Sequence, residues 1–457
     1  MSTAGAFDPT PVESMADLAA WLEAGSKPAA DWRIGTEHEK FGFNLKTHEP
    51  LPFENPNGGP SVRKMLEGFQ RFGWAVVEED GFPIGCKRDG ASLSLEPGGQ
   101  FELSGAPVET VHQTCAEASA HLNELREIAE ELGAGFMGVG FAPTWSLEDM
   151  PRVPKARYGL MRAYMAKVGR LGREMMFRTA TVQVNVDFSS EADMVKKLRV
   201  ALALQPLVTA LFANSPFSDG RLNGWQSLRA HIWTDTDPDR TGMLPFAFED
   251  GFGFEAYVDW AVDVPMYFVR RNDQFIDAQG CTFRQFLDGR YPAAPGERPS
   301  LGDWEDHLST LFPEARVKRF IETRGADSGP WARICALPAF WTGLLYDQSA
   351  LDAAWDLIKP WTAPEREAMR LTAPMLGLNT PTPIGPMKDL AAQALEIASA
   401  GLKARDRRSA AGDDETLFLK SLREIVARGR TPAEELIALY KGEWGGAVEP
   451  AFEACAY

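Results

Sequence analysis

The chain has 457 residues, of which 44% are hydrophobic and 24% charged, and its formal net charge is −17. This composition is typical of a globular protein with a large core. The excess of acid argues against a nucleic-acid or anionic-membrane surface, because both need a basic patch. The sequence has no run of about 18 apolar residues, so we predict no membrane span.

The N-terminal segment and the cysteines bear on where the protein is found. The first thirty residues are small, acidic and interrupted by prolines, and they lack the features of a signal or transit peptide. The five cysteines are too few and too scattered for a disulfide framework, and none belongs to a C-x-x-C pair. We therefore expect a cytoplasmic protein with mostly reduced thiols.

The N-terminal third alternates short strands with helices. Clusters of Pro, Asn and Gly separate these elements, and Gly133 ends the longest helix. We predict helices at residues 14–22, 63–72 and 111–132, strands at 33–43, 74–77 and 92–95, a strand that resumes after 97–99, a loop at 46–60 and a turn near 89–90.

Two glutamates stand two residues apart in the strand predicted at 33–43. Side chains alternate along a strand, so Glu37 and Glu39 share one face and His38 projects from the other. Two carboxylates so close repel each other unless a cation lies between them or one is protonated. Mg²⁺, a hard ion bound by oxygen, would resolve that repulsion. Solvated surface charges are the alternative interpretation.

The clearest strand covers residues 179–188. Its odd-numbered residues, which include Gln183 and Asn185, are all polar, and its even-numbered residues are all apolar. This pattern is typical of an antiparallel sheet with one face on a core and the other facing water or a polar cavity.

The chain becomes helical towards its C terminus. We predict a helix at 191–212, a strand at 317–324, and a late helix that begins at Thr431 and ends near Gly442. Because strands and helices are interleaved irregularly, an α+β fold fits better than a doubly wound sheet. We expect a single domain over residues 1–457, sheet-rich to about 345 and helical over 346–457.

Further acids and several arginines are candidates for a site. Glu96 and Glu102 share a parity if the Pro-Gly-Gly break between them does not shift the register, and Glu322 shares a strand face with Arg324. Arginine forks suit carboxylates and phosphates, whereas surface charges and weak surface salt bridges are the alternative for each residue. The basic candidates are Arg157, Arg178, Arg229 and Arg324.

Common nucleotide and metal motifs are absent from the sequence. There is no G-x-x-x-x-G-K-[ST] loop, no G-x-G-x-x-G after a predicted strand and no H-E-x-x-H pair, and the six histidines show no zinc-ligand spacing. If the chain binds a nucleotide, it must therefore do so through carboxylate-held metal and arginines.

Four longer motifs carry a resemblance to a known family. They are GTEHEKFG at 35–42, SLEPGGQFELSG at 94–105, HIWTDTD at 231–237 and TRGAD at 323–327. With the closing LYKGEW at 439–444, they make the chain similar to the plant-type glutamate–cysteine ligases of plants and many proteobacteria, from about residue 30 to the C terminus. The resemblance implies an α+β fold related to the glutamine synthetase catalytic domain, in which a curved, largely antiparallel sheet forms a funnel with helices outside.

The resemblance also implies a reaction. In this family the γ-carboxylate of glutamate attacks the terminal phosphate of ATP, and the amine of cysteine displaces phosphate from the resulting γ-glutamyl phosphate. Phosphorylation divides one difficult step into two easier ones, because a carboxylate is a poor acylating agent, and Mg²⁺ spreads the phosphoryl charge. The implied substrates are L-glutamate, L-cysteine and ATP, the implied cofactor is Mg²⁺, and the step is the first of glutathione biosynthesis.

Individual residues can be assigned by the same resemblance. Arg324 matches a residue that faces the ATP phosphates and Glu39 a metal ligand needed for turnover, so these two are the predicted catalytic residues. For Trp233 and Tyr267, an ordinary place in the hydrophobic core is the alternative interpretation. The expected metal ligands are Glu37, Glu39, Glu96, Glu102 and Glu322, and the expected substrate-binding residues are Arg157, Arg229, Gln183, Asn185, Trp233 and Tyr267.

Two cysteines match a regulatory disulfide of the plant members. Cys115 and Cys335 stand at its positions, whereas a second plant disulfide would need a partner for Cys281 near residue 294, where the chain has no cysteine. At most one of the two bridges can therefore form, and two reduced core thiols are the alternative.

Alternative functions remain open on the sequence. One is a carboxylate–amine ligase of the same fold with another amine acceptor, and the other is a non-catalytic metabolite or nucleotide sensor, against which the intact acidic set speaks. The missing transit peptide favours a bacterial, cytoplasmic protein over a plastid one. We expect no nucleic-acid or membrane partner, and either a monomer or a homodimer.

Overall fold

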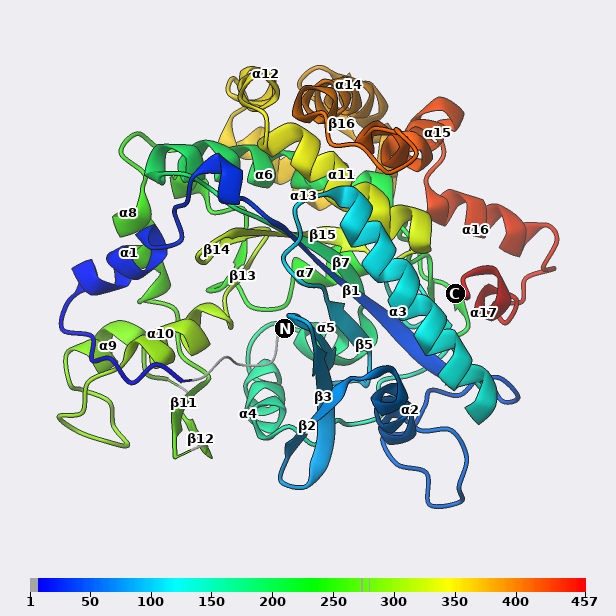
Figure 1. Ribbon diagram of the computed structural model, residues 1–457, viewed down its shortest axis with the longest axis horizontal. Helices are drawn as coiled ribbons and strands as arrows, with labels where there is room; N and C mark the ends of the chain where they lie inside the picture. Colours follow the sequence, from blue (N-terminus) through cyan, green and yellow to red (C-terminus); the bar gives the residue numbers. More distant parts are fainter. Residues whose placement is uncertain (1–6, 273, 279) are drawn as a thin grey trace.

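The computed structural model describes residues 7–272, 274–278 and 280–457. Within these residues the largest element is an antiparallel sheet of nine strands (Figure 1). Its strands are β1 (Ile34–Asn44), β2 (Ala75–Glu79), β3 (Phe82–Arg88), β4 (Ala91–Leu95), β5 (Phe101–Ser104), β6 (Ala134–Met137), β7 (Thr181–Val186), β14 (Ala315–Val317) and β15 (Ile321–Asp327). Eight of them follow the order β14-β15-β7-β1-β5-β4-β3-β2, and β6 also pairs with β1.

The long strand β1 joins the two halves of the sheet. Its first part pairs with β7, its middle with β5, and its last four residues with β6. The register places Glu39 opposite Glu102 and Glu37 opposite Gln183. Side chains directly opposite each other on neighbouring strands point to the same face, so this register gathers polar residues from three strands on one side of the sheet.

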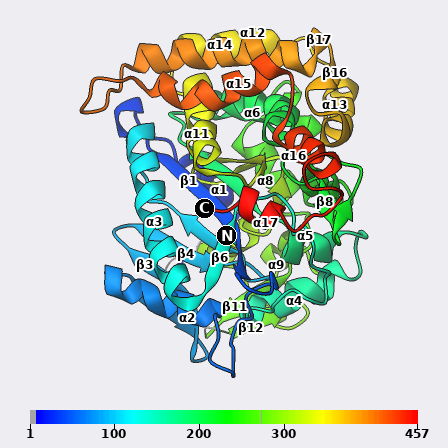
Figure 2. The same ribbon diagram turned by 90° about the vertical axis from the view of Figure 1, so that its right-hand side faces the viewer.

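Long helices cover the sheet and bury its apolar residues. Val182, Val184 and Val186 of β7 are fully buried, and the helices that pack on the strands are α3 (Val111–Leu132), α6 (Glu191–Phe212) and α11 (Trp331–Leu345). A further helical layer lies outside α6 and α11 (Figure 2). It consists of α12 (Gln348–Ile358), α13 (Ala363–Leu376), α14 (Met387–Arg405) and α15 (Lys420–Arg428).

Shorter elements complete the molecule around the edges of the sheet. No helix in the described part of the chain combines the length and the hydropathy needed to cross a bilayer. The short helices are α1 (Met15–Glu23), α2 (Val62–Gly68), α4 (Ala156–Met165), α5 (Gly172–Arg178), α7 (Leu228–Trp233), α8 (Phe254–Ala261), α9 (Phe283–Leu287), α10 (Leu301–Leu308), α16 (Pro432–Lys441) and α17 (Ala451–Ala454). The short strands are β8 (Phe217–Ser218), β9 (Arg221–Leu222), β10 (Thr241–Gly242), β11 (Phe268–Arg271), β12 (Gln274–Asp277), β13 (Phe312–Pro313), β16 (Pro381–Thr382) and β17 (Gly385–Pro386).

The predicted α+β fold with a large antiparallel sheet and helices outside is confirmed. Helix α3 ends at Gly133, whose φ of 75° is the left-handed conformation that glycine adopts at little cost. Helix α16 begins after its Thr431 cap, as predicted. The division into a sheet-rich and a helical part of one domain remains a prediction.

One strand prediction was wrong in detail, and one strand was missed. The strand expected at 317–324 is a hairpin, because the chain turns at 318–320 between β14 and β15. No Gly, Pro, Asn or Asp marks that turn, so the usual turn signals are missing. Strand β3 was not predicted, because its Pro83 and Gly85 resemble loop residues.

Candidate active site

A cavity lies against the polar face of the sheet. Apolar side chains complete its wall, among them Met161, Met175, Met176, Trp233 and Phe312. Its charged lining comes from separate strands, the loop after β4 and helix α7. It consists of Glu37, Glu39, Glu96, Glu322, Arg229, Arg316 and Arg324. Convergent charges in a partly apolar cavity are the usual mark of a site for small polar ligands.

The two β1 carboxylates are buried and hydrogen-bonded. Glu37 accepts a hydrogen bond from Asn185 Nδ2 at 3.0 Å, and Glu39 accepts one from the backbone N–H of Thr181 at 3.1 Å. The exposed fractions of these glutamates are 6% and 8%. Neither forms a salt bridge with any residue that the structure describes. Lys318 acts on Glu37, and Arg229 on Glu39, through space and without ion-pair contact. Buried charge that is only partly balanced is unfavourable, so this part of the cavity attracts cations.

Burial has the expected effect on the titration of these acids. It raises the pKa of Glu37 to about 7, and the charges of Glu322 and Glu102 add to the increase. Burial also raises the pKa of Glu39 well above its ordinary value, with contributions from Glu96 and Glu102. The pKa of Glu96 rises for the same reason. A divalent cation would reverse these shifts, because it favours the charged carboxylates.

Glu102 lies beside this group but is not among the described residues that line the cavity. It is fully buried on β5, where the hydroxyls of Ser94 and Ser104 donate to its carboxylate at 2.9 and 3.1 Å. Its position opposite Glu39 in the register brings the two acids together. The structure thus supports the predicted proximity of Glu102 to the other acids.

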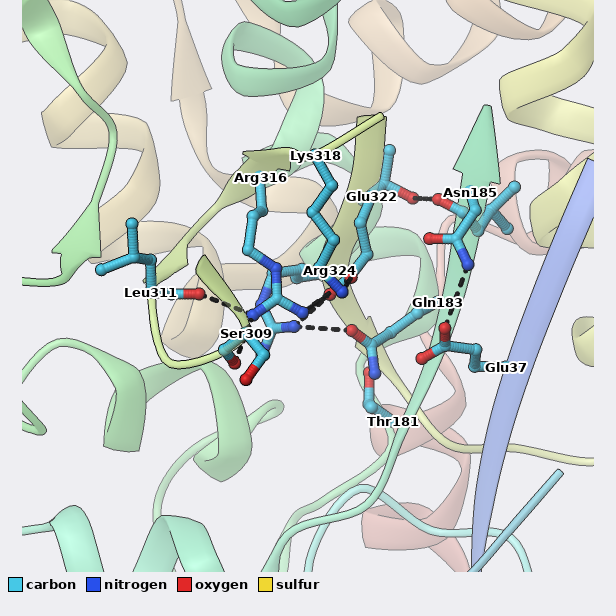
Figure 3. Close-up of polar contacts among 12 residues, drawn as sticks. Glu37, Thr181, Gln183, Asn185, Ser309, Leu311, Arg316, Lys318, Glu322 and Arg324 are labelled. Carbon is cyan, nitrogen blue, oxygen red and sulfur yellow. Dashed lines mark hydrogen bonds and ion pairs between the residues drawn. The ribbon is translucent and has the colours of Figure 1, made fainter. Parts of the chain in front are cut away.

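Glu322 differs from the other acids because three cations surround it (Figure 3). Arg316 Nη2 donates to both carboxylate oxygens at 2.7 Å. Lys318 Nζ lies 3.2 Å from one oxygen, and Arg324 Nη1 donates to the other. Although burial opposes the change, these cations hold the pKa of Glu322 well below its ordinary value. Glu322 is therefore ionised in this structure, and the three basic side chains balance its negative charge.

Three further predicted residues meet Arg324 at the cavity. Arg324 Nη1 donates to Gln183 Oε1 at 2.8 Å, and the ring of Trp233 lies 5.5 Å from its guanidinium carbon. Arg229 Nη2 donates to the backbone carbonyl of Arg324 at 2.8 Å. Arg229 lies near Asp327, whose own oxygens accept from Asn214, Ser215 and Ser227. The two arginines are thus held by the fold with their charges beside the acids.

The remaining substrate-binding candidates lie outside the described cavity lining. Arg157 of α4 stacks on Tyr158 at 5.4 Å and interacts electrostatically with Glu96. Asn185 contacts Glu37 and lines the adjoining pocket described next. Tyr267 is 1% exposed, and the guanidinium carbon of Arg240 lies 4.0 Å from its ring. The position of Tyr267 fits the alternative interpretation as a core aromatic.

An adjoining pocket shares Glu37 with the cavity. Its lining includes four basic residues, Lys27, Arg33, Lys87 and Arg88, and three acidic ones, Glu37, Asp89 and Asp187. Asp187 pairs with Lys27 at 2.9 Å. Glycines and small polar residues of β1, β4 and β5, such as Gly35, Ser92 and Ser104, form much of the remaining wall. The lining is therefore of mixed charge, with more basic than acidic side chains, and the basic ones suit an anionic ligand.

Sequence reasoning missed several lining residues, and Arg316 is the most prominent. It stands opposite Glu322 in the β14–β15 register. The pairing of oppositely charged residues across a hairpin would have indicated it, had the turn at 318–320 been recognised. Phe312 and Thr181 also line the cavity, but their residue types gave no signal.

The acidic residues of the site have the chemistry that Mg²⁺ requires, but some of them are better suited to bind it than others. Oxygen ligands with raised pKa values at Glu37, Glu39 and Glu96 suit a hard cation. The carboxylate of Glu322 is already occupied by basic side chains. Across the described ranges, no group of three or more His, Cys, Asp or Glu residues is close enough to hold a metal ion. The acids therefore surround a cavity without forming a finished metal site.

Cys115 and Cys335 are both free and buried. They lie on α3 and α11, which pack together, and their thiols interact. Burial raises the pKa of the Cys115 thiol, and the neighbouring Cys335 adds to the increase. The structure shows the reduced form, and formation of the bridge under oxidising conditions stays a prediction.

The site defines a class of protein, one that binds small charged ligands in a cavity on the polar face of an antiparallel sheet. Comparison with known proteins identifies the family. The chain matches the sequence model of glutamate–cysteine ligase family 2 over residues 33–454. The chain therefore belongs to that family, and the resemblance predicted from its motifs is confirmed.

Individual relatives support the same assignment. The chain is 55% identical to the chloroplastic glutamate–cysteine ligase of Arabidopsis thaliana, over 96% of this chain and 82% of that protein. It is 54% identical to the chloroplastic glutamate–cysteine ligase B of Oryza sativa subsp. japonica, over 96% of this chain and 87% of that protein. A crystal structure of a Francisella tularensis glutamate–cysteine ligase in complex with AMP has a TM-score of 0.55 at 13% identity, covering 93% of this chain and 87% of that chain, and this likeness shows the fold.

The comparison corrects one prediction. We expected a cytoplasmic protein from the first thirty residues, but curated relatives that are 54–55% identical over 96% of the chain are chloroplastic enzymes. The expectation of a cytoplasmic protein is therefore contradicted. Leader composition was a weak basis for it, because targeting segments differ between proteins that share a catalytic fold.

Proposed function

We propose that the protein is a glutamate–cysteine ligase, which joins the γ-carboxylate of L-glutamate to the amine of L-cysteine with cleavage of ATP, in the first step of glutathione biosynthesis. One observation carries the proposal: the cation-poor carboxylates Glu37 and Glu39 share a cavity with Arg229 and Arg324. Membership of the family and the names of the relatives support it.

The basic residues are suited to holding the anionic groups of the substrates. We assign Arg229, supported by its contact with the Arg324 carbonyl, to the α-carboxylate of glutamate. Arg324 faces the same cavity and is assigned to the phosphoryl group in transfer. Arg157, which interacts with Glu96 from α4, is the second candidate for glutamate.

The acids are suited to the metal and to the nucleotide that comes with it. Glu37, Glu39 and Glu96, with Glu102 beside them, would hold Mg²⁺, which would neutralise phosphate charge and align the reacting oxygens when bound. The adjoining pocket of mixed charge meets the cavity at Glu37 and is the proposed place of ATP. This arrangement would bring a terminal phosphate to the cavity where glutamate binds.

The cavity wall is consistent with cysteine as the acceptor. Three methionines and Phe312 line it, and a thiol is a small, weakly polar group that packs well against thioethers and rings. A different amine acceptor is the second candidate, because no described residue marks the thiol alone. The protein would act as a monomer or a homodimer without a nucleic-acid or membrane partner.

A coupled assay of ADP release tests the proposal. Release should require glutamate, cysteine and Mg²⁺ together, and the product should have the mass of γ-glutamylcysteine. Serine and 2-aminobutyrate, offered in place of cysteine, measure acceptor selectivity. Glu39→Gln, in the cavity, is the test variant. Glu424→Gln, on the exposed side of α15, is its matched control. ADP release without glutamate, or equal rates with every amine, would contradict the assignment.

A further inference from the structure

Arg316 is a buried basic residue of the cavity wall that lies outside every motif on which the family resemblance rests. Its side chain is 2% exposed. One guanidinium nitrogen, Nη2, donates to both oxygens of Glu322, and the other, Nη1, donates to the carbonyls of Ser309 and Leu311 at 2.9 and 2.7 Å (Figure 3). The backbone on one side and Glu322 on the other therefore fix the guanidinium group.

The carboxylate of Glu322 has no spare acceptor position in this arrangement. An ionised carboxylate has about four lone-pair sites. Arg316 uses both oxygens, while Lys318 and Arg324 each contact one. The side chains of Lys318 and Arg324 are 17% and 11% exposed, so they are closer to solvent than Arg316. Arg316 is thus the fixed partner of Glu322, and the other two cations are the exchangeable ones.

The position of Arg324 depends on this fixed pair. Its guanidinium group is held between Glu322 and Gln183, above the ring of Trp233. We propose that Arg316 is a positioning residue of the ligase reaction, which fixes Glu322 and, through Glu322, directs Arg324 into the cavity. This inference rests on the proposed function, because it assigns Arg316 a part in that reaction.

Loss of Arg316 should change the place of Arg324 without removing it. Glu322 would keep only Lys318 and Arg324 as donors, and its freed oxygens would attract them more strongly. Arg324 would then leave Gln183 and turn towards Glu322. A lysine at this position should not compensate, because an ammonium group has three N–H donors and cannot make four hydrogen bonds, two to the carboxylate and two to the carbonyls.

The experiment compares Arg316→Ala and Arg316→Lys with Arg271→Ala. Arg271 makes a similar two-pronged contact with Asp303, at 2.7 and 3.1 Å, and is not a described lining residue of the cavity. We expect Arg316→Ala to lower kcat about a hundredfold, because small misplacement of a positioned group has effects of that size, while the KM for cysteine stays within about threefold. Arg271→Ala should reduce thermal stability but leave kcat unchanged.

Two readouts separate positioning from a merely structural role. Added guanidinium ion should restore at least a tenth of the lost turnover of Arg316→Ala, roughly a tenfold gain over the unrescued variant, and should not affect Arg271→Ala. A crystal structure of Arg316→Ala should show that Arg324 has left Gln183. If Arg316→Ala does not fold, Arg316→Lys replaces it, with the same expected loss of kcat and the same displacement of Arg324.

The results that overturn the inference are specific. Wild-type kcat in folded Arg316→Ala or Arg316→Lys would exclude a positioning role, and so would an unchanged Arg324–Gln183 contact in the variant structure. Failure of the proposed function is recognised separately. If the wild-type protein forms no γ-glutamylcysteine, that function fails, whereas the crystal structure of the variant still decides whether Arg316 holds Arg324 in place.

Discussion

The acids of β1 and the acid of β15 lie in one cavity but in opposite electrostatic states. Glu37 and Glu39 are buried without a salt bridge to any described residue, and their pKa values are raised. Glu322 is equally buried, but three cations surround it and its pKa is lowered. Burial alone therefore does not decide what a carboxylate can do. The β1 acids are suited to bind a cation, and Glu322 is suited to orient arginines.

The largest expected difference between the two regions concerns turnover. Glu39→Gln keeps the shape of the side chain but removes charge from the cation-poor region, so we expect a loss of about a thousandfold in kcat. Circular dichroism and thermal melting should show an intact fold. A variant that retains near-normal turnover in the coupled assay would remove Glu39 from the site.

The next difference concerns stability. Glu322→Gln leaves Arg316, Lys318 and Arg324 without their shared counterion, and breaking a buried ion pair costs about 3–5 kcal/mol. Glu37→Gln relieves repulsion instead, so the ligand-free protein should become slightly more stable. Denaturant unfolding of both variants measures the two changes. Shifts of the same sign would show that the two regions are not electrostatically opposed.

The pH dependence of stability sharpens the same comparison. The pKa of Glu37 is about 7 in the folded protein and near 4.5 in the unfolded chain, so the native state binds more protons between these values. Stability should therefore fall as pH rises from about 4.5 to 7, by up to about 3 kcal/mol from this residue. Glu37→Gln should flatten the slope. A slope unchanged by the substitution would mean that another group produces it.

The smallest expected effect concerns a part of the molecule away from both regions. If Cys115 and Cys335 form a bridge, oxidation should raise activity about two- to fivefold, a change of less than about 1 kcal/mol. Cys115→Ser should abolish the response. Assays with and without reductant decide the matter, and equal activity in both would reject a regulatory disulfide.

Local patterns predicted what local geometry controls. Alternation along β1 placed Glu37 and Glu39 on one face, and alternation along β7 placed Gln183 on the polar face that lines the cavity. Capping residues located the ends of α3 and α16. These features depend on a few neighbouring residues, so the sequence was sufficient to find them.

Features that depend on distant contacts could not be predicted in the same way. The pairing of Glu39 with Glu102 follows from the strand register, and the cluster around Glu322 follows from a hairpin whose turn has no usual signal. Nothing near Tyr267 distinguishes a core aromatic from a cavity wall, and its place became clear from its packing on Arg240. The reaction itself was inferred from family resemblance, which the family match supports.

The most direct test of the central claim is the binding of Mn²⁺, as a paramagnetic substitute for Mg²⁺, measured by electron paramagnetic resonance in the wild-type protein and two variants. If the cation-poor acids of β1 hold the metal, Glu37→Gln should weaken binding at least tenfold, a change of about 1.4 kcal/mol, and Glu424→Gln should leave it unchanged. Wild-type affinity in Glu37→Gln would contradict the account.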